Sequence, residues 1–513
     1  MTSRILVDHI YRHARSTPDK LALAHDNRAV SYGELWRRIL NAAAQLRDLG
    51  VRPQDRVLLA ALWEPDFVYA YFACHRLGAV AVPVAAQVPA ETLAAIVETL
   101  RPRLACLAKP QDLDCSCTTL PRSGVDELAP SGDLEFPDPG APADILLTSG
   151  TTGKPKGVVL GHRSIVAAAR NINAFIGNTA EDRELIALPL NHSFGLGRLR
   201  CQMLAGGAVI FSEGLLFPKK LFAAMELWKA TGFAFVPAGW SMLTRLTGEK
   251  LADFSNQLRY IEIGSAPMPR EQKERLIRLF PLTRICMHYG LTEASRSVFI
   301  ELHESADHLD SIGKPAPNVK IRIVDAEGRD VGAGETGAIM IRGDHVMTGY
   351  WNTPAEPRPP DAWLPSGDMG YRSDDGYLYL CGRVDDVINV GGRKVYPAEV
   401  EGALRQHDIV ADCVCIGMTD PRKITGESVV AFLVARENSG DLPGLRELTD
   451  FLINKLELFK IPVAYEWISA IPRNANGKAE RGQLRTQAMS RLSGMPTRLE
   501  VQEIHDTVAR PRT

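Results

Sequence analysis

The stretch ADILLTSGTTGKPKG, residues 143–157, is the segment around which the rest of the chain can be placed. ADILL is a short apolar run that predicts a buried strand. The next ten residues, 148–157, hold three glycines, four hydroxyl side chains and two lysines. Glycines let backbone N–H groups approach an anion closely, and hydroxyl and ammonium groups add donors. The segment therefore predicts a polyphosphate-binding loop rather than a flexible glycine turn. It is not a Walker A loop, because Gly153-Lys154 is followed by Pro155.

Short strand and helix signals alternate on both sides of this loop. SYGE, residues 31–34, is a capping box, and apolar residues at helical spacing follow it. A helix is also predicted over 65–77. Strands are predicted at 56–62, 79–83, 104–107, 185–188, 208–211, 233–236, 259–264 and 284–288. This alternation predicts an α/β fold of layered, largely parallel sheets. Residues 109–141, rich in Pro, Asp, Ser and Gly, predict a surface excursion.

From about residue 312 the pattern becomes β-rich, with short strand signals at 320–324, 338–342 and 377–380. After Arg383 a compact α/β unit begins, with predicted strands in VADCVCIG (410–417) and SVVAFLVA (428–435) and a helix at 445–456. In the first of these strands, Cys413 and Cys415 should share one face. The sequence thus predicts a large body followed by a smaller unit of about 100 residues.

Composition excludes several classes of protein. Of 513 residues, 45% are hydrophobic and 23% charged, and the formal net charge is −2. This composition is ordinary for a globular protein. The near-zero net charge gives no sign of binding to nucleic acid or to an anionic membrane. Nine cysteines are an odd, sparse set, which favours reduced thiols in a cytoplasmic enzyme. The apolar run at 67–86 is interrupted by His75 and Arg76, so no membrane span is expected.

Three further segments carry side chains suited to a nucleotide. MHYGLTE (287–293) offers Tyr289 to stack on a base, Thr292 to reach a phosphate and Glu293 to hold Mg²⁺. Asp368, in SGD (366–368), could accept both hydroxyls of a ribose, with Arg383 adding a donor. PRNANGK (472–478) is a polar loop that ends in a lysine.

Taken in order, these segments resemble the adenylate-forming superfamily of acyl-CoA synthetases, peptide-synthetase adenylation domains and luciferases. The resemblance spans about residues 10–485. Besides the segments above, it is carried by LPLNHSFG (188–195), GSAPM (264–268), SIGKP (311–315), GETGAIMIRG (334–343), TGYW (348–351), SGDMG (366–370) and GRVDDVINVGGRKVYPAEVE (382–401). It implies a large N-terminal body of layered α/β sheets with a small β region at 1–383, a hinge at 384–387, a small mobile α+β domain at 388–487, and a tail at 488–513.

The resemblance also implies a role for individual residues. The ATP phosphates would meet Thr148, Ser149, Gly150, Thr151, Thr152 and Lys156, and the adenine and substrate carboxylate would meet Gly264, Ser265, Ala266 and Pro267. His288, Tyr289 and Gly290 are further cofactor-binding residues, with Tyr289 on the adenine. Thr292 would contact the α-phosphate, Glu293 would coordinate Mg²⁺, and Asp368 and Arg383 would hold the ribose.

The remaining implied roles concern catalysis and domain movement. Lys478 would bridge the substrate carboxylate and the α-phosphate. His192 would gate the junction of acyl tunnel and thiol channel. Asp385 would be the hinge, about which Gly391, Gly392, Arg393 and Lys394 approach the acceptor. A degenerate, merely ATP-binding relative would be expected to lack Lys478 or Glu293, and both are present.

The segments expected to frame the acyl pocket, including Phe235, Trp240 and Gly264, contain no acidic residue for an α-amino group apart from Glu293. The expected reaction is therefore ATP-dependent activation of a hydrophobic carboxylic acid to an acyl-adenylate, with acyl transfer to CoA as the first expectation. A carrier-protein phosphopantetheine and direct capture by an amine such as an amino acid stay open as alternatives.

Overall fold

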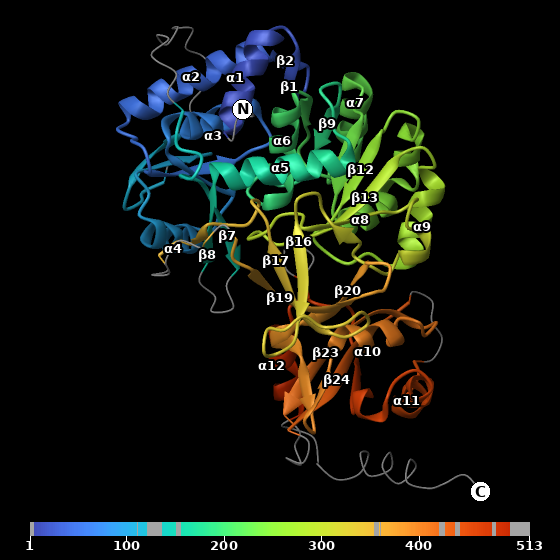
Figure 1. Ribbon diagram of the computed structural model, residues 1–513. Helices are drawn as coiled ribbons and strands as arrows, with labels where there is room; N and C mark the ends of the chain where they lie inside the picture. Colours follow the sequence, from blue (N-terminus) through green and yellow to red (C-terminus); the bar gives the residue numbers. More distant parts are fainter. Residues whose placement is uncertain are drawn as a thin grey trace, which may run out of the picture. The chain divides into compact units, whose positions relative to one another are not determined.

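The computed structural model describes residues 5–109, 111–120, 136–149, 155–352, 359, 361–419, 426–436, 442–473 and 479–492 (Figure 1). The chain forms two compact units. The first comprises Met1–Ile321 with Ile341–Leu364, and the second Arg322–Met340 with Pro365–Thr513. Each unit is described by itself below. Residues 322–340 and 365–383 group with the C-terminal residues here, and the predicted hinge at 384–387 stays a prediction.

The first unit contains a nine-stranded sheet. Its order is β15-β14-β13-β12-β11-β9-β10-β1-β2. The strands are β1 (Leu21–His25), β2 (Arg28–Ser31), β9 (Arg183–Ile186), β10 (Ala208–Phe211), β11 (Gly232–Phe235), β12 (Tyr260–Ile263), β13 (Arg284–Tyr289), β14 (Val298–Glu301) and β15 (Lys314–Pro315). The six strands from β1 to β13 run parallel, and antiparallel strands close both edges. The predicted largely parallel α/β layer is confirmed.

A second sheet, of seven strands, carries the predicted phosphate loop. Its order is β18-β8-β7-β4-β3-β5-β6. The strands are β3 (Arg56–Ala61), β4 (Val80–Ala85), β5 (Leu104–Leu107), β6 (Ser116–Thr119), β7 (Pro142–Ser149), β8 (Pro155–Gly161) and β18 (Gly349–Tyr350). β6 lies within the predicted surface excursion and was missed, because its sequence SCTT is polar and only its pairing with β5 makes it a strand.

Helices cover both sheets of the first unit. They are α1 (Leu6–Ser16), α2 (Tyr32–Asp48), α3 (Pro65–Leu77), α4 (Ala90–Leu100), α5 (His162–Ile176), α6 (Ser193–Ala205), α7 (Pro218–Trp228), α8 (Pro237–Thr247) and α9 (Arg270–Leu279). α2 begins at the predicted capping box, where the Ser31 side chain accepts a hydrogen bond from the Glu34 N–H. None of the helices in the described ranges is long and apolar enough to cross a membrane.

The two faces of the nine-stranded sheet differ in chemistry. Side chains alternate along each strand, so Ile261 and Ile263 lie on the face opposite to Tyr260 and Glu262. The isoleucine face packs against α7, α8 and α9 in an apolar core. Burying each large apolar side chain there contributes roughly 1.5–3 kcal/mol. The Glu262 face is buried too, but it holds charged side chains that pair with residues of α6.

Three small sheets lie wholly or mainly in the second unit. β16 (Lys320–Val324), β17 (Gly337–Arg342), β19 (Leu364–Arg372) and β20 (Leu378–Arg383) form one, β21 (Ile388–Val390) and β22 (Arg393–Val395) another, and β23 (Val410–Thr419), β24 (Glu427–Ala435) and β25 (Ala464–Trp467) the third. The helices are α10 (Pro397–Leu404), α11 (Leu445–Ile453) and α12 (Arg481–Leu492). Cys413 and Cys415 lie in one core on the same face of β23, as predicted, and all nine cysteines are free.

Candidate active site

The two ends of the predicted phosphate loop lie in the paired antiparallel strands β7 and β8, a hairpin in which Ser149 stands opposite Pro155. Thr148 stands opposite Lys156 across the hairpin, and its hydroxyl donates to the Lys156 carbonyl at 3.4 Å. The Lys156 side chain is exposed. Gly150, Thr151 and Thr152 lie outside the described residues, as does the side chain of Ser149. The structure therefore fixes where the loop leaves and rejoins the sheet.

A buried ion cluster anchors the root of this hairpin. Asp144 of β7 accepts from the Tyr71 hydroxyl at 3.0 Å, contacts His75 Nε2 at 2.9 Å, and pairs with Arg200 of α6. Burial raises the pKa of Asp144, but Arg200 and His75 outweigh it and keep that pKa below its usual range. A buried, fully paired carboxylate gives the loop a firm base.

Tyr350 of β18 joins the hairpin to the predicted metal ligand. β18 pairs with β8, which places the Tyr350 ring 5.8 Å from Lys156 Nζ. The Tyr350 hydroxyl donates to Glu293 Oε1 at 2.8 Å, and the Met347 N–H donates to the Glu293 carbonyl at 2.8 Å. Lys156 and Glu293, 137 positions apart in the numbering, are thereby brought to one place. The TGYW run marked this segment in the sequence, but nothing local assigned Tyr350 a partner.

Thr292 and Glu293 lie in a tight turn after β13. Leu291 and Ala294 exchange backbone hydrogen bonds of 3.1 and 3.2 Å, so the two predicted site residues lie between them. Both side chains are half-buried, as is that of Tyr289 at the end of β13. A Cβ at Gly290 would collide with the backbone nitrogen of Arg296, so the turn requires glycine there.

The segment 264–267 leaves β12 beside the turn after β13. β12 and β13 are parallel neighbours, so both segments emerge at the carboxyl edge of the sheet, where α/β folds bind ligands. Gly264 has no room for a Cβ, because the His288 imidazole occupies that position. Ser265 has a left-handed φ of 73°, which is uncommon for a residue with a side chain. Ala266 and Pro267 follow and are partly or fully exposed.

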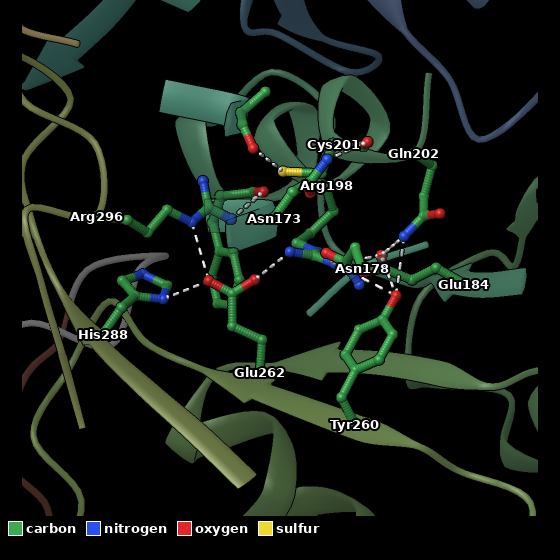
Figure 2. Close-up of polar contacts among 12 residues, drawn as sticks. Asn173, Asn178, Glu184, Arg198, Cys201, Gln202, Tyr260, Glu262, His288 and Arg296 are labelled. Carbon is green, nitrogen blue, oxygen red and sulfur yellow. Dashed lines mark hydrogen bonds and ion pairs between the residues drawn. The ribbon is translucent and has the colours of Figure 1, made fainter. Parts of the chain in front are cut away.

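Beneath these segments lies a buried network of two carboxylates and two guanidinium groups (Figure 2). Glu262 Oε1 contacts His288 Nδ1 at 2.7 Å and accepts from Arg296 Nε at 2.9 Å, and Glu262 Oε2 contacts Arg198 Nη1 at 3.0 Å. Arg198 also forms a bidentate pair with Glu184, with both distances 2.6 Å.

The network is electrically balanced. Burial raises the pKa of Glu262, but Arg296, Arg198 and His288 outweigh it, so its pKa lies well below the usual range and the carboxylate is ionised. Burial lowers the pKa of His288, which favours a neutral imidazole at neutral pH, although Glu262 opposes the shift. Two negative and two positive side chains then cancel. The sequence shows Glu262 and Arg198 only as charges inside apolar runs, YIEIG and GLGRLRC, and such charges signal buried pairs.

His192 immediately precedes α6, with extended backbone geometry at the helix N-cap. Its side chain is half-buried, and burial lowers its pKa, which favours the neutral form. The backbone carbonyls of the next two residues, Ser193 and Phe194, accept hydrogen bonds from Arg296 at 2.9 Å each. The predicted gate thus adjoins the buried network.

Phe235 and Trp240, predicted to line the acyl pocket, lie together but in the apolar core. Their rings stack with centroids 5.7 Å apart, each residue is 1% exposed, and Trp240 Nε1 donates to Gln272 Oε1. Both belong to the core on the α7–α9 face of the sheet, whereas Gly264 lies at the end of β12 against His288. Their role as pocket wall stays a prediction.

In the second unit, Asp368 and Arg383 are cross-strand partners on β19 and β20. Arg383 Nη1 donates to Asp368 Oδ1 at 3.0 Å, and the Asp368 N–H donates to Ser366 Oγ. Asp385 lies in a 3₁₀ turn, Val384–Asp386, and Lys394 lies exposed on β22. Gly391 and Gly392 form the β21–β22 turn with φ of 60° and 81°. Lys478 lies outside the described residues.

Metal binding in the first unit would depend on Glu293. Among the described residues, no group of three or more His, Cys, Asp or Glu side chains could hold a metal ion by itself. Mg²⁺ usually takes one or two carboxylates and completes its shell with water and substrate phosphates. Glu293, held next to the lysine-bearing hairpin, fits that donor set.

Comparison with known proteins supplies the family. Residues 10–351 match the family described as AMP-binding enzyme. Residues 399–478 match the family described as AMP-binding enzyme C-terminal domain. The chain is 30% identical over 490 residues to a feruloyl-CoA synthase of an Amycolatopsis species, covering 92% of this chain and 97% of that protein. It is 31% identical over 512 residues to an indoleacetate–CoA ligase of Aromatoleum aromaticum, covering 94% and 97%.

A solved structure agrees with this. The o-succinylbenzoate CoA synthetase from Bacillus subtilis, in complex with the acyl-adenylate intermediate OSB-AMP, matches with a TM-score of 0.79 and 28% identity, covering 93% of this chain and 97% of that one. With a family match over residues 10–351 and relatives of full length, the chain belongs to the AMP-binding enzymes of the adenylate-forming superfamily.

Proposed function

We propose that this AMP-forming acid ligase joins a hydrophobic carboxylic acid to the thiol of CoA. ATP and the acid would first give an acyl-adenylate and pyrophosphate, and CoA would then displace AMP. Relatives of similar length are named for CoA ligation, and one related structure holds an acyl-adenylate. ATP and CoA are cytoplasmic pools, so the cytoplasm is the compartment we propose.

One observation carries the proposal: Tyr350 contacts both the lysine of the hairpin and the carboxylate of the turn. Lys156 and the backbone of the hairpin loop would bind the phosphates of ATP. Glu293 would hold Mg²⁺ against them, and the bound ion would supply positive charge to the phosphate oxygens. A related structure of the Bacillus subtilis enzyme contains ATP and magnesium.

The chain's cations address the main barrier to the first step. A carboxylate is a poor nucleophile toward ATP because both are anions. Lys478 would bridge the substrate carboxylate and the α-phosphate, Lys156 would bind the departing pyrophosphate, and Thr292 would donate to the α-phosphate. Groups fixed before the reaction stabilise transition-state charge without reorganising, which is usually the largest catalytic contribution.

The remaining residues would complete adenylate binding and the second step. Tyr289 and the 264–267 segment would enclose the adenine, while Asp368 and Arg383 would hold the ribose. Lys478 is needed for adenylation and not for thiol attack. We therefore propose that the domain 388–487 turns about Asp385, withdrawing Lys478 and presenting Gly391, Gly392 and Lys394 to the acceptor.

For the acid we propose an aryl or cyclic carboxylate. The segments 235–240, 264–266 and 289–295 hold no carboxylate besides Glu293 with which to bind an α-amino group. Relatives at 30–31% identity are named for ferulate, indoleacetate and 2-succinylbenzoate.

A carrier protein is the second candidate acceptor. Another relative, from Streptomyces coeruleorubidus and also 31% identical, is named as a fatty acid–[acyl-carrier-protein] ligase.

The proposal is tested by product analysis. The full-length protein is incubated with ATP, Mg²⁺ and a panel of aryl, cyclic and aliphatic acids, with CoA, holo-carrier protein and mixed amino acids present together. Mass spectrometry should find an acyl-CoA thioester and equimolar AMP. An acyl-carrier product or an amide would overturn CoA as acceptor, and no acid-dependent pyrophosphate release would overturn the proposal as a whole.

The assignment of Lys478 has its own test. Lys478→Ala should reduce the rate of adenylation by at least about 100-fold, because it removes the positive charge that would stabilise the transition state. Transfer from a supplied acyl-adenylate to CoA should stay within about threefold of wild type, because thiol attack does not use that lysine. Equal loss of both half-reactions would contradict the assignment. Lys460→Ala, which removes another lysine of the second unit paired with Glu399 and Glu457, is the control.

A further inference from the structure

Arg296 connects three segments of the proposed site. It lies two residues after the turn that carries Thr292 and Glu293, its Nε donates to Glu262, and its two terminal nitrogens donate to the carbonyls of Ser193 and Phe194. These two carbonyls belong to the first residues of α6, directly after His192. Figure 2 shows Arg296 beside Glu262 and His288, with α6 adjoining.

The surroundings are built to accommodate this guanidinium group. Arg296 is 2% exposed, and its carbon Cζ lies 4.8 Å from the centre of the Phe194 ring. Gly197, one helical turn into α6, leaves room for it, because a Cβ there would collide with Arg296 Nη1. Arg296 also has a left-handed φ of 52°. An arginine held in that conformation indicates that surrounding contacts determine its position.

Glu262, the carboxylate that pairs with Arg296, is equally fixed in position. Glu262 is fully buried and also contacts Arg198 and His288, so it cannot turn away without losing these contacts as well as its pair with Arg296. The His192 side chain, by contrast, makes no hydrogen bond to another described residue, and its backbone carbonyl opens α6 by accepting from Leu196. The orientation of His192 therefore depends on how the first turn of α6 is held.

We propose that Arg296 is a positioning residue, which fixes the His192 gate relative to the Glu293 turn by clamping the first two carbonyls of α6. The inference rests on the proposed function, transfer to CoA, and on the gate role that the family resemblance implies for His192. Arginine suits the task because its planar fork can donate in several directions at once, whereas lysine presents a single nitrogen. The clamp should therefore matter more for acyl transfer than for adenylation.

The test compares both half-reactions in Arg296→Lys, His192→Ala and the double variant. Arg296→Lys should slow transfer from preformed adenylate to CoA by about tenfold while adenylation stays within about threefold. If Arg296 acts through His192, the double variant should transfer no more than about twofold slower than His192→Ala alone. Gly197→Ala gives a second route to the same result, because its methyl displaces the guanidinium without removing the buried charge.

Arg200→Lys is the matched control, since Arg200 is a buried arginine of the same helix that pairs with Asp144. It should lower thermal stability. Any slowing of acyl transfer that it causes should multiply with the slowing caused by His192→Ala. The inference is overturned if Arg296→Lys and Gly197→Ala slow both half-reactions equally, as a general loss of folding would, or if their effects multiply with that of His192→Ala. The proposed function fails separately, if wild-type enzyme transfers no acyl group to CoA.

Discussion

At the scale of single residues, Tyr350 makes the most consequential contact outside the predicted set. Its hydroxyl donates to Glu293 Oε1 at 2.8 Å and its ring faces Lys156. Tyr350→Phe should keep the ring and lose the donor, so Glu293 is no longer oriented. Because the pair is half-buried, we expect a loss of about 1 kcal/mol, which is about fivefold in the Mg²⁺ concentration needed for half-maximal adenylation.

The measurement is pyrophosphate release as a function of free Mg²⁺ at saturating ATP. Tyr32→Phe is the matched control, because the buried Tyr32 hydroxyl donates to the Gly207 carbonyl elsewhere in the same unit. It should lower stability and leave the Mg²⁺ dependence alone. An unchanged Mg²⁺ dependence in Tyr350→Phe would show that Glu293 does not rely on this contact.

Single residues also mark the limit of what the sequence predicts about the site. Thr148, Lys156, Thr292 and Glu293 could be selected by their chemistry within two short motifs. The partner of Glu293 could not, because Tyr350 reaches it only through the pairing of β18 with β8, which lie almost 200 residues apart in the chain. Glu262 and Arg296 were missed similarly, since long-range packing decides which buried charges pair.

At the scale of elements, the ends of β12 and β13 interlock through Gly264 and His288. Gly264→Ala should push the imidazole away from Glu262, because the new Cβ would occupy its place. Overpacking of this kind costs about 1–3 kcal/mol. Adenylation should fall with it, since both segments border the proposed adenine site.

The measurements are urea unfolding and acid-dependent pyrophosphate release. Gly402→Ala is the control, because a Cβ at Gly402 in α10 meets no atom within 4 Å and alanine favours a helix. It should leave both quantities near wild type. Wild-type behaviour of Gly264→Ala would mean that this contact is not needed for binding.

Elements were predictable where their own residues mark both ends. α3 occupies the predicted 65–77, because Pro65 opens it and Gly78 closes it in the left-handed conformation. β5 and β10 also match their apolar runs. β6 was missed because its polar residues form a strand only by pairing with β5. Periodicity predicts what an element buries, while the choice of neighbouring strand depends on tertiary contacts.

At the scale of the whole molecule, buried histidines should make stability depend on pH. Burial lowers the pKa of His345 to about 4 from an ordinary 6.5, although Asp344 opposes the shift, and Ser297 Oγ lies 2.9 Å from its Nε2. Between pH 6.5 and 4 the unfolded chain binds a proton that the folded chain does not. The free energy of unfolding therefore falls as pH falls through this window, by about 2.5 kcal/mol at pH 4.5 for this group.

The check is urea unfolding of the wild type and His345→Asn from pH 7.5 to 4.5. Whatever the variant costs at pH 7.5, its unfolding free energy should fall less steeply below pH 6.5. His162, whose pKa burial lowers to about 3, should contribute a second proton in both proteins. Parallel curves for the two proteins would show that folding leaves the pKa of His345 unchanged.

Domain movement belongs to the same scale and can be tested at one residue. Asp385 lies in the 3₁₀ turn Val384–Asp386, where a proline φ near −65° is tolerated locally. Asp385→Pro should therefore fold and adenylate within about threefold of wild type, while the stiffened backbone slows acyl transfer by about tenfold or more. Asp385→Ala is the control: it removes the same carboxylate but leaves φ free, so it should retain transfer.

The two variants together separate a hinge from a binding residue. If Asp385 acted through its carboxylate, alanine and proline would impair transfer alike. If the turn served only to hold the second unit together, proline would reduce adenylation and transfer in equal proportion and lower the unfolding temperature. Selective loss of transfer in the proline variant alone indicates that the backbone at 384–387 changes its dihedral angles between the two half-reactions. Proline differs from alanine in the conformations it allows and in lacking an N–H, and among the turn and loop hydrogen bonds of the described residues none has the Asp385 N–H as its donor.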